Sequence, residues 1–278
     1  MTKSKRAEKG QAAGVTAREV HEVEDLSSPR TPVIYEVVRR LGEEEMDRPA
    51  VSLWWSGIAA GLSISFSLLA QAILHTKLPE ASWSPIIESF GYCAGFLMVV
   101  MARQQLFTES TITVVLPVLA DFRWVKVWQM ARLWAIVLAA NLVGTFVAAA
   151  FCTFTPVLTA EIVEGMLKVS APLLELTWSE TLFRGIGAGF LMAGMVWLIP
   201  GADSAQFQII TLMTWLIQVG GFSHIVAGSM EAYMLLLAGQ WSVLTMLGGF
   251  FVPVLIGNVI GGTVLFALIS YAQVMKEI

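Results

Sequence analysis

The feature that most constrains this chain is a short pattern that occurs twice, each time inside a hydrophobic stretch too long for one membrane crossing. The first copy is Phe107-Thr108-Glu109 and the second is Phe222-Ser223-His224. Each copy has an aromatic residue, a hydroxyl suited to cap a helix, and a titratable side chain. Interruptions at matching positions of two apolar halves predict a duplicated membrane protein with a transport site at the interruptions.

Two further short patterns occur in the same order in both halves, and we call such repeated patterns echoes. Asn141-Leu142-Val143-Gly144 matches Asn258-Val259-Ile260-Gly261, and Gly57-Ile58-Ala59-Ala60-Gly61 matches Gly185-Ile186-Gly187-Ala188-Gly189. The small residues favour close helix packing. We expect four polar residues to lie in the core of the repeat: Asn141, Asn258, Ser223 and Glu109.

The composition agrees with a membrane protein, since 56% of the residues are hydrophobic and 14% are charged. A helix that spans a bilayer needs about 20 mostly apolar residues. We therefore predict an all-α membrane protein with six transmembrane helices, duplicated within itself. The spans are expected near residues 51–75, 86–119, 130–154, 180–199, 207–237 and 241–271.

Three of these spans are longer than a crossing requires. We expect the second to break at Arg103-Gln104-Gln105 and the fifth at Gly220-Gly221-Phe222-Ser223. The sixth has no polar interruption, so tilt or a cytoplasmic extension is the simpler explanation of its length.

The positive charge is concentrated at one end, since nine of the 17 Lys and Arg residues precede residue 50. The positive-inside rule then predicts a multi-pass protein with both termini in the cytoplasm. Residues 1–31 are polar and are predicted to be a disordered cytoplasmic tail. Residues 49–278 form the predicted six-span channel domain.

Residues 32–48 are predicted to form an amphipathic helix. Its apolar face consists of five residues: Val33, Ile34, Val37, Val38 and Leu41. Such a helix lies along the inner membrane surface or packs on a neighbouring subunit, and the sequence favours neither alternative.

Motifs of enzymes are missing, because the chain has no HExxH, P-loop or GxSxG pattern. The two cysteines, Cys93 and Cys152, do not form a cluster suited to zinc. We therefore predict that the protein is not an enzyme, and that it binds no metal, cofactor or nucleic acid.

Ionisable side chains inside the spans are few, and each is expected to face a cavity or a partner because exposure to lipid is costly. They include Arg103, Glu109, His224 and Glu231. His224 follows two glycines and a serine at the expected start of a half-helix, which favours a functional role. Glu109 is better explained as an acid that complements the dipole of a helix capped by Thr108. Arg103 could pair with Glu109 or reach the cytoplasmic vestibule.

Three motifs together resemble the formate/nitrite transporter family. They are Leu106-Phe107-Thr108, Gly221-Phe222-Ser223-His224 and Ile256-Gly257-Asn258-Val259-Ile260-Gly261-Gly262, and the likeness covers roughly residues 33–275. The resemblance implies an aquaporin-like protomer in the lipid bilayer of the bacterial inner membrane, with its six spans arranged as an inverted three-helix repeat. It implies assembly as a homopentamer with one pore per protomer. It also implies small monovalent anions or their conjugate acids as substrates, such as formate, nitrite or hydrosulfide, together with protons.

The resemblance also assigns roles to individual residues. His224 and Thr108 would relay a proton in the pore, and Leu106 and Phe107 would gate its cytoplasmic mouth. The cytoplasmic constriction would contain Phe96 and Met192, and the outer constriction Tyr92 and Ile217.

The chain departs from well-known members at four positions, which places it in the YfdC-like branch of the family and leaves the substrate open. Gln105 replaces an acid, Gly228 and Gly189 replace asparagines, and Leu173 replaces a lysine.

A mechanism follows from elementary electrostatics. Dehydration makes a bare anion costly in an apolar constriction, whereas a small neutral acid is tolerated. Half-helix N-termini would attract the anion to the centre, where a histidine, which ordinarily titrates near pH 6.5, could supply a proton.

Two other classes of function remain. One is a neutral-solute channel of the aquaporin type, although paired Asn-Pro-Ala motifs are absent from the sequence. The other is a membrane scaffold or regulatory protein whose pore no longer conducts.

Overall fold

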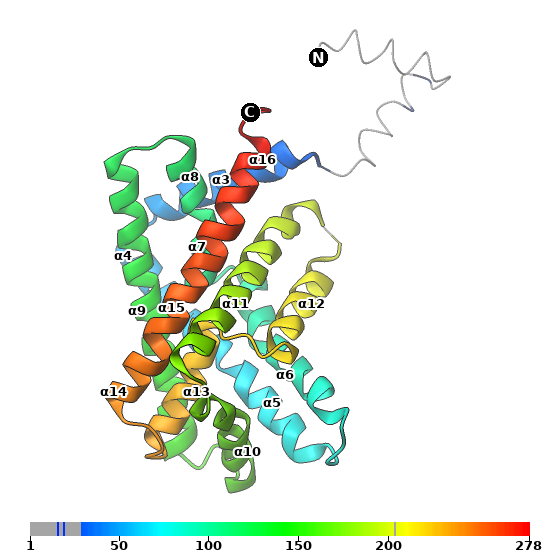
Figure 1. Cartoon of the computed structure of the whole chain (residues 1–278), viewed down its shortest axis with the longest axis vertical. Coiled ribbons are helices and arrows are strands. Elements are labelled where there is room, and N and C mark those ends of the chain that lie inside the picture. Colours follow the sequence, from blue (N-terminus) through cyan, green and yellow to red (C-terminus); the bar gives the residue numbers. More distant parts are fainter. Residues whose placement is uncertain (1–15, 17–18, 20–28, 203) are drawn as a thin grey trace.

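The computed structural model describes residues 16, 19, 29–202 and 204–278. Most of the predicted disordered tail, residues 1–31, lies outside the described residues. Within the described part, all regular secondary structure is helical (Figure 1). We call the end of the bundle that carries α3 (Thr31–Asp47) and the C-terminus the terminal end, and the opposite end, which carries α10 (Ala160–Ser170), the distal end.

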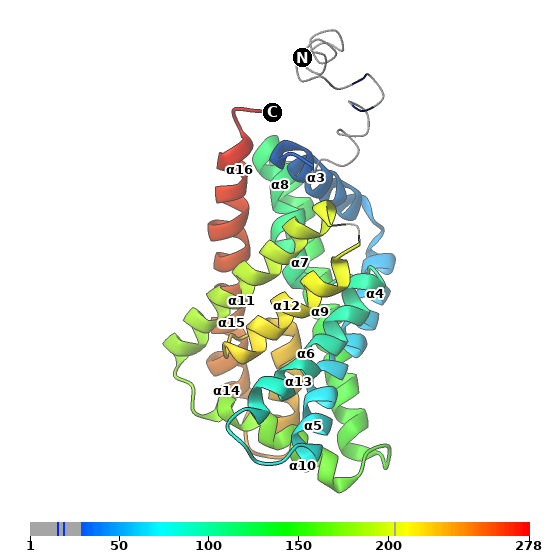
Figure 2. The ribbon, with the colours of Figure 1, turned by 90° about the vertical axis from the view of Figure 1, so that its right-hand side faces the viewer.

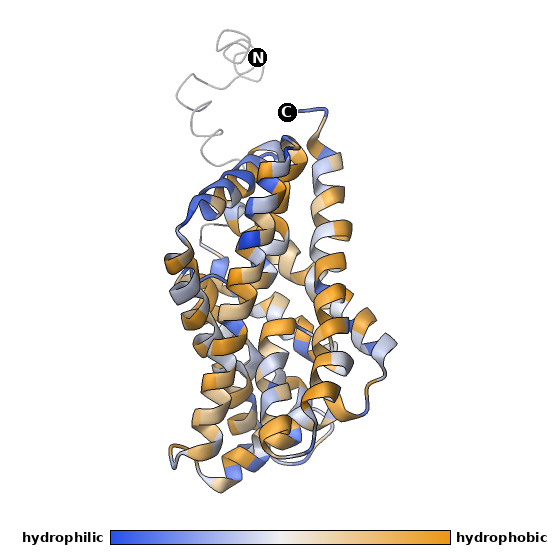
Figure 3. Ribbon diagram, turned by 90° about the vertical axis from the view of Figure 1, so that its left-hand side faces the viewer, coloured by the Kyte–Doolittle hydropathy of each residue, from blue (hydrophilic) through white to orange (hydrophobic). Residues whose placement is uncertain are grey.

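Five helical segments in the described residues are long and apolar enough to cross a membrane. They are α4 (Ala50–Ile64) with α5 (Phe66–Lys77); α6 (Ser84–Met101); α9 (Trp124–Phe154); α11 (Trp178–Leu198) with η2 (Ile199–Gly201); and residues Val243–Val274. Hydrophobic residues cover the flanks of the bundle, and the hydrophilic ones gather on α3 and the end loops (Figure 3).

Both predicted breaks are present. α6 ends at Met101, and the chain resumes as α7 (Phe107–Thr113) and α8 (Val115–Ala120). In the second half, α12 (Gln206–Val219) is followed by α13 (Ile225–Leu237). One residue with positive φ lies in each break, Arg103 at 51° and Gly221 at 65°. Glycine adopts this conformation without strain, whereas arginine does so at a cost.

The last segment differs from the expectation of a simple long helix. It contains α14 (Val243–Thr245), η3 (Met246–Phe251), α15 (Val252–Val259), η4 (Ile260–Ala267) and α16 (Leu268–Val274). The segments η3 and η4 are π-helical, a wider winding that often marks functional sites. Thr263 in η4 donates a hydrogen bond to the carbonyl of Thr111, 2.7 Å away, so η4 packs against α7.

The glycine echoes lie where helices cross closely. A Cβ added to Gly61 on α4 would lie 2.3 Å from the carbonyl oxygen of Asn141 on α9. A Cβ on Gly189 of α11 would lie 2.3 Å from the carbonyl oxygen of Asn258 on α15. No larger residue fits at either crossing without separating the helices.

Helix α3 (Thr31–Asp47) lies across the terminal end of the bundle (Figure 2). Its buried residues are Tyr35, Val38, Gly42 and Met46. Of the predicted apolar face, Val38 is buried, whereas Val33 and Val37 are each 47% exposed. Gly42 sets the side of α3 that packs on the bundle, since its Cα approaches the backbone of Thr113 so closely that no side chain fits between. The exposed valines remain available to a bilayer surface or to another subunit.

Candidate functional site

The N-termini of α7 and α13 are each held by an asparagine from another helix. The backbone N–H of Phe107 donates to Oδ1 of Asn141 at 2.9 Å. The backbone N–H of Ile225 donates to Oδ1 of Asn258 at 2.8 Å. These bonds satisfy N–H groups that a helix cannot satisfy within itself.

The amide nitrogens of the two asparagines complete the same pattern. Nδ2 of Asn141 donates to the carbonyls of Gly57 and Gln105, at 2.8 and 2.9 Å. Nδ2 of Asn258 donates to the carbonyls of Gly185 and Ser223, at the same two distances. Both side chains are fully buried, so each asparagine ties the break in one segment to two neighbouring helices.

These hydrogen bonds correct the register of the first sequence echo. Ile225 occupies the position that Phe107 occupies in the first half, whereas the echo had matched Phe107 with Phe222. The ring of Phe222 instead packs against Gly187 and Gly220, where an added Cβ would lie 2.5 and 2.8 Å from it.

The predicted hydroxyl caps were also wrong. α7 has Leu106 at its N-cap and no side-chain cap, so Thr108 lies inside its first turn. α13 is capped by His224, and Ser223 takes part through its backbone carbonyl. Capping by asparagines from other helices leaves the hydroxyl of Thr108 free for a different contact.

That contact is with His224. Nδ1 of His224 accepts a hydrogen bond from the backbone N–H of Ala227 at 3.1 Å. Because Nδ1 is an acceptor here, the proton of the neutral ring lies on Nε2, which donates to Oγ1 of Thr108 at 2.7 Å. Thr108 and His224 are 0% and 1% exposed. The hydroxyl proton of Thr108 therefore remains available to a third group.

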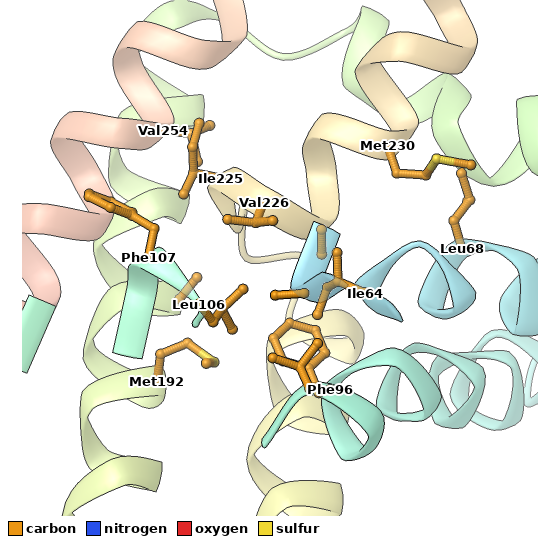
Figure 4. Packing of buried hydrophobic residues seen from close by; sticks show 14 of the residues in the cluster. Ile64, Leu68, Phe96, Leu106, Phe107, Met192, Ile225, Val226, Met230 and Val254 are labelled. Carbon is orange, nitrogen blue, oxygen red and sulfur yellow. The ribbon is translucent and has the colours of Figure 1, made fainter. Parts of the chain in front are cut away.

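Apolar side chains surround this pair. The ring of Phe96 meets the ring of His224 edge-on, with centroids 5.0 Å apart, and Tyr92 lies 5.0 Å from Phe96. Leu106, Phe96 and Met192 converge in the centre of the bundle (Figure 4). All the residues assigned to the gate and the constrictions are buried: Tyr92, Phe96, Leu106, Phe107, Met192 and Ile217. Phe96, assigned to the cytoplasmic constriction, directly contacts the central histidine.

Glu109 lies in the first turn of α7, as the helix-dipole interpretation requires. Its Oε1 is buried and has no hydrogen-bond partner among the described residues. Arg103 is exposed and forms no ion pair with Glu109 in the part of the chain that the structure describes.

A further link, between α3 and the broken segment, was not anticipated from the sequence. Oε1 of Glu45 accepts from Nε2 of Gln105 at 3.1 Å, and Oε2 accepts from the hydroxyl of Thr113 at 2.5 Å. Burial raises the pKa of the Glu45 carboxyl, and the two hydrogen bonds oppose that rise. In the sequence, the signal for this link was Gln105, which stands where well-known family members have an acid. A second carboxylate could not donate a hydrogen bond to Glu45.

Comparison with known proteins decides the family. The sequence model described as Formate/nitrite transporter matches residues 32–272. The chain belongs to the formate/nitrite transporter family. The matched region includes the α3 helix, both breaks and the two asparagines, so the site lies wholly within it.

Members of this family are similar to the chain over most of its length. The inner membrane protein YfdC of Escherichia coli (strain K12) is 41% identical over 91% of this chain and 82% of its own, which confirms the YfdC-like assignment. The formate channel FocA of Haemophilus influenzae is 27% identical over 70% of each chain. The chain is therefore a membrane channel or transporter, not an enzyme.

Solved structures share the fold. A structure titled FNT family ion channel has a TM-score of 0.73 at 19% identity, covering 87% of this chain and 98% of its own. A pentameric formate channel with formate bound has a TM-score of 0.67 at 18% identity, covering 81% and 98%.

Proposed function

We propose that the chain forms a homopentameric channel or transporter for small monovalent anions or their conjugate acids, in which His224 relays a proton. The observation that carries this proposal is the hydrogen bond between His224 and Thr108. It joins the two breaks, at the starts of two half-helices, inside a shell of apolar side chains.

The proposal includes an aquaporin-like protomer of six spans related by an inverted repeat. Its support is the matched set of hydrogen bonds around Asn141 and Asn258, each to one backbone N–H and two carbonyls. The equivalent glycine crossings in the two halves give the same support.

Electrostatics at the centre favours a transient anion. The segments Phe107–Ala120 and Ile225–Leu237 start at the breaks, and helix N-termini carry partial positive charge. No charged side chain contacts His224 among its described partners. An anion is therefore attracted without a fixed counter-ion that would trap it.

The proton given to the anion comes from water through His224 and Thr108. A hydronium ion protonates the ring at Nδ1, which releases water and breaks the bond from Ala227. The charged ring then passes its Nε2 proton to Thr108, while the hydroxyl proton of Thr108 passes to the anion. The neutral acid leaves, and the ring returns to its starting tautomer by losing the Nδ1 proton to water and taking one from water at Nε2.

Flux through purified protein in liposomes tests this function. We expect uptake of formate, nitrite or hydrosulfide that rises as external pH falls and that is accompanied by protons. Uptake of glycerol with no anion flux would identify a neutral-solute channel instead. Absence of any flux would favour a scaffold or regulatory protein.

Assembly is tested separately. Large apolar side chains such as Trp128, Phe151 and Phe183 are exposed on the flanks of one chain, which leaves surface for subunit contacts as well as lipid. Native mass spectrometry in mild detergent is expected to detect five protomers. A stable monomer or tetramer would contradict the proposal.

Substitution of the proposed gate residues is expected to produce a measurable leak. Leu106 and Phe107 are 1% and 2% exposed in the cluster that separates the break from the centre. Replacing both by alanine removes apolar volume there, so the leak of small ions from liposomes is expected to rise about tenfold or more. The matched control is alanine at Phe207 and Leu212, each 55% exposed on α12. An equal leak in both double variants would place the barrier elsewhere.

We also propose that both termini lie in the cytoplasm and that the chain resides in the bacterial inner membrane. The terminal end carries many of the basic residues, including Arg39, Arg48 and Lys126, and α3 lies there with Val33 and Val37 exposed.

A further inference from the structure

Helix α13 contains one residue that its packing does not explain. Residues 225–235 are all buried except Glu231, which is partly exposed. Glu231 has no hydrogen bond or ion pair within the described part of the chain, and its carboxylate oxygens are not sealed from solvent. A carboxylate on an otherwise buried helix must therefore face an opening that water reaches.

The neighbours of the preceding residues fix the direction of that opening. Gly228 packs against Phe250 of η3, and Ser229 meets Thr145 of α9 with hydroxyls 2.8 Å apart. Met230 points toward Leu68 of α5 (Figure 4). Successive residues lie about 100° apart around the helix, so each of these three residues faces a different neighbouring element.

Glu231 takes the next step and faces away from η3, α9 and α5, toward the side of the helix on which His224 lies. His224 precedes Glu231 by seven residues, which is two helical turns, so both lie on one face and about 10 Å apart along the helix. Tyr92 likewise lies one turn from Phe96, the residue that contacts His224.

The basic side chains at this end do not pair with Glu231. Those on α5 and α10 are paired with other carboxylates: His75 with Glu88 at 3.1 Å, Lys77 with Glu161 at 3.4 Å and Lys168 with Glu164 at 2.9 Å. The other titratable groups on the distal parts of α6 and α9 are Tyr92, Cys93 and Cys152, and none of them is a cation at neutral pH. Within the described residues, no cation therefore compensates the carboxylate of Glu231.

We infer that Glu231 is a specificity-determining residue at the distal mouth of the pore, where it disfavours free anions and admits the neutral conjugate acid. The inference rests on the proposed function and specifies which protonation state of the substrate passes that mouth. An anion approaching Tyr92 from the distal end meets a fixed negative charge in a partly buried setting, where screening is weak. A neutral acid meets no such repulsion.

The test compares the parent with Glu231→Gln in liposomes at pH 8.5. Glutamine keeps the size and polarity of the side chain and removes the charge. Formate uptake is expected to rise about tenfold, which corresponds to about 1.4 kcal/mol. The control is Glu80→Gln, which removes the same charge from the exposed loop between α5 and α6 and is expected to leave uptake unchanged.

An unchanged or lower uptake in Glu231→Gln would overturn the inference, and lower uptake would identify Glu231 as a proton donor. If neither protein conducts formate or any acid, the proposed function fails, and the inference fails with it. If the variant does not assemble, a measurement on the parent alone tests the inference. The reversal potential of the parent is measured in planar bilayers under a gradient of formate salt. A strong preference for the anion would overturn the inference, and a weak preference would support it.

Discussion

His224→Asn is expected to reduce proton-coupled uptake of a weak-acid anion about 100-fold, in line with the usual contribution of a positioned acid or base. The asparagine oxygen can still cap the N–H of Ala227, although the side chain is too short to replace Nε2 in the bond to Thr108. Asparagine does not titrate near neutral pH, so the substitution keeps the cap of α13 and removes the proton relay. Uptake and internal pH are measured together in liposomes.

The control for this variant is His75→Asn, which removes a histidine at the distal end that pairs with Glu88. It is expected to retain the pH dependence of the parent. If His224→Asn keeps the same pH dependence as well, the histidine is structural and the relay mechanism is wrong.

Asn141→Leu is expected to be the most destabilising single change in the site. It leaves the N–H of Phe107 and the carbonyls of Gly57 and Gln105 without their partner, in a fully buried setting. A buried unsatisfied group costs about 1–3 kcal/mol, so a loss of at least about 2 kcal/mol is expected. Thermal unfolding in detergent, followed by size-exclusion chromatography, measures it.

Asn258→Leu removes the matching three bonds in the second half and is expected to have a similar effect. Val143→Ala, at an exposed position two residues after Asn141, serves as the control. A melting temperature near that of the control for either leucine variant would show that the asparagines do not hold the breaks.

The sequence predicted the features that depend on local composition. The breaks near Arg103 and Gly220 were visible because polar or glycine residues interrupt runs too long for one crossing. The asparagine and glycine echoes marked helix crossings because only small residues allow such approach. Resemblance to the family also singled out Thr108 and His224, which the structure brings into contact.

Features that depend on contacts between distant segments could not be predicted in the same way. The first backbone N–H groups of α7 and α13 are bound by asparagines more than 30 positions away, so a serine or threonine beside each helix start was a misleading local signal. The packed face of α3 is set by the approach of Gly42 to Thr113, not by the valine stripe. Glu231 appeared only as an ionisable residue in a span, because its exposure depends on every neighbour of α13.

The asparagine caps have a consequence for the order in which the protein is made. α7 emerges before α9, and α13 before α15, so the first backbone N–H of each half-helix has no asparagine partner until a later segment inserts. An unpaired amide is costly in hydrocarbon. Each half-helix should therefore reach its stable position only after the following span has inserted. In a chain that ends before residue 243, α13 should be mobile, although every residue of its break is already present.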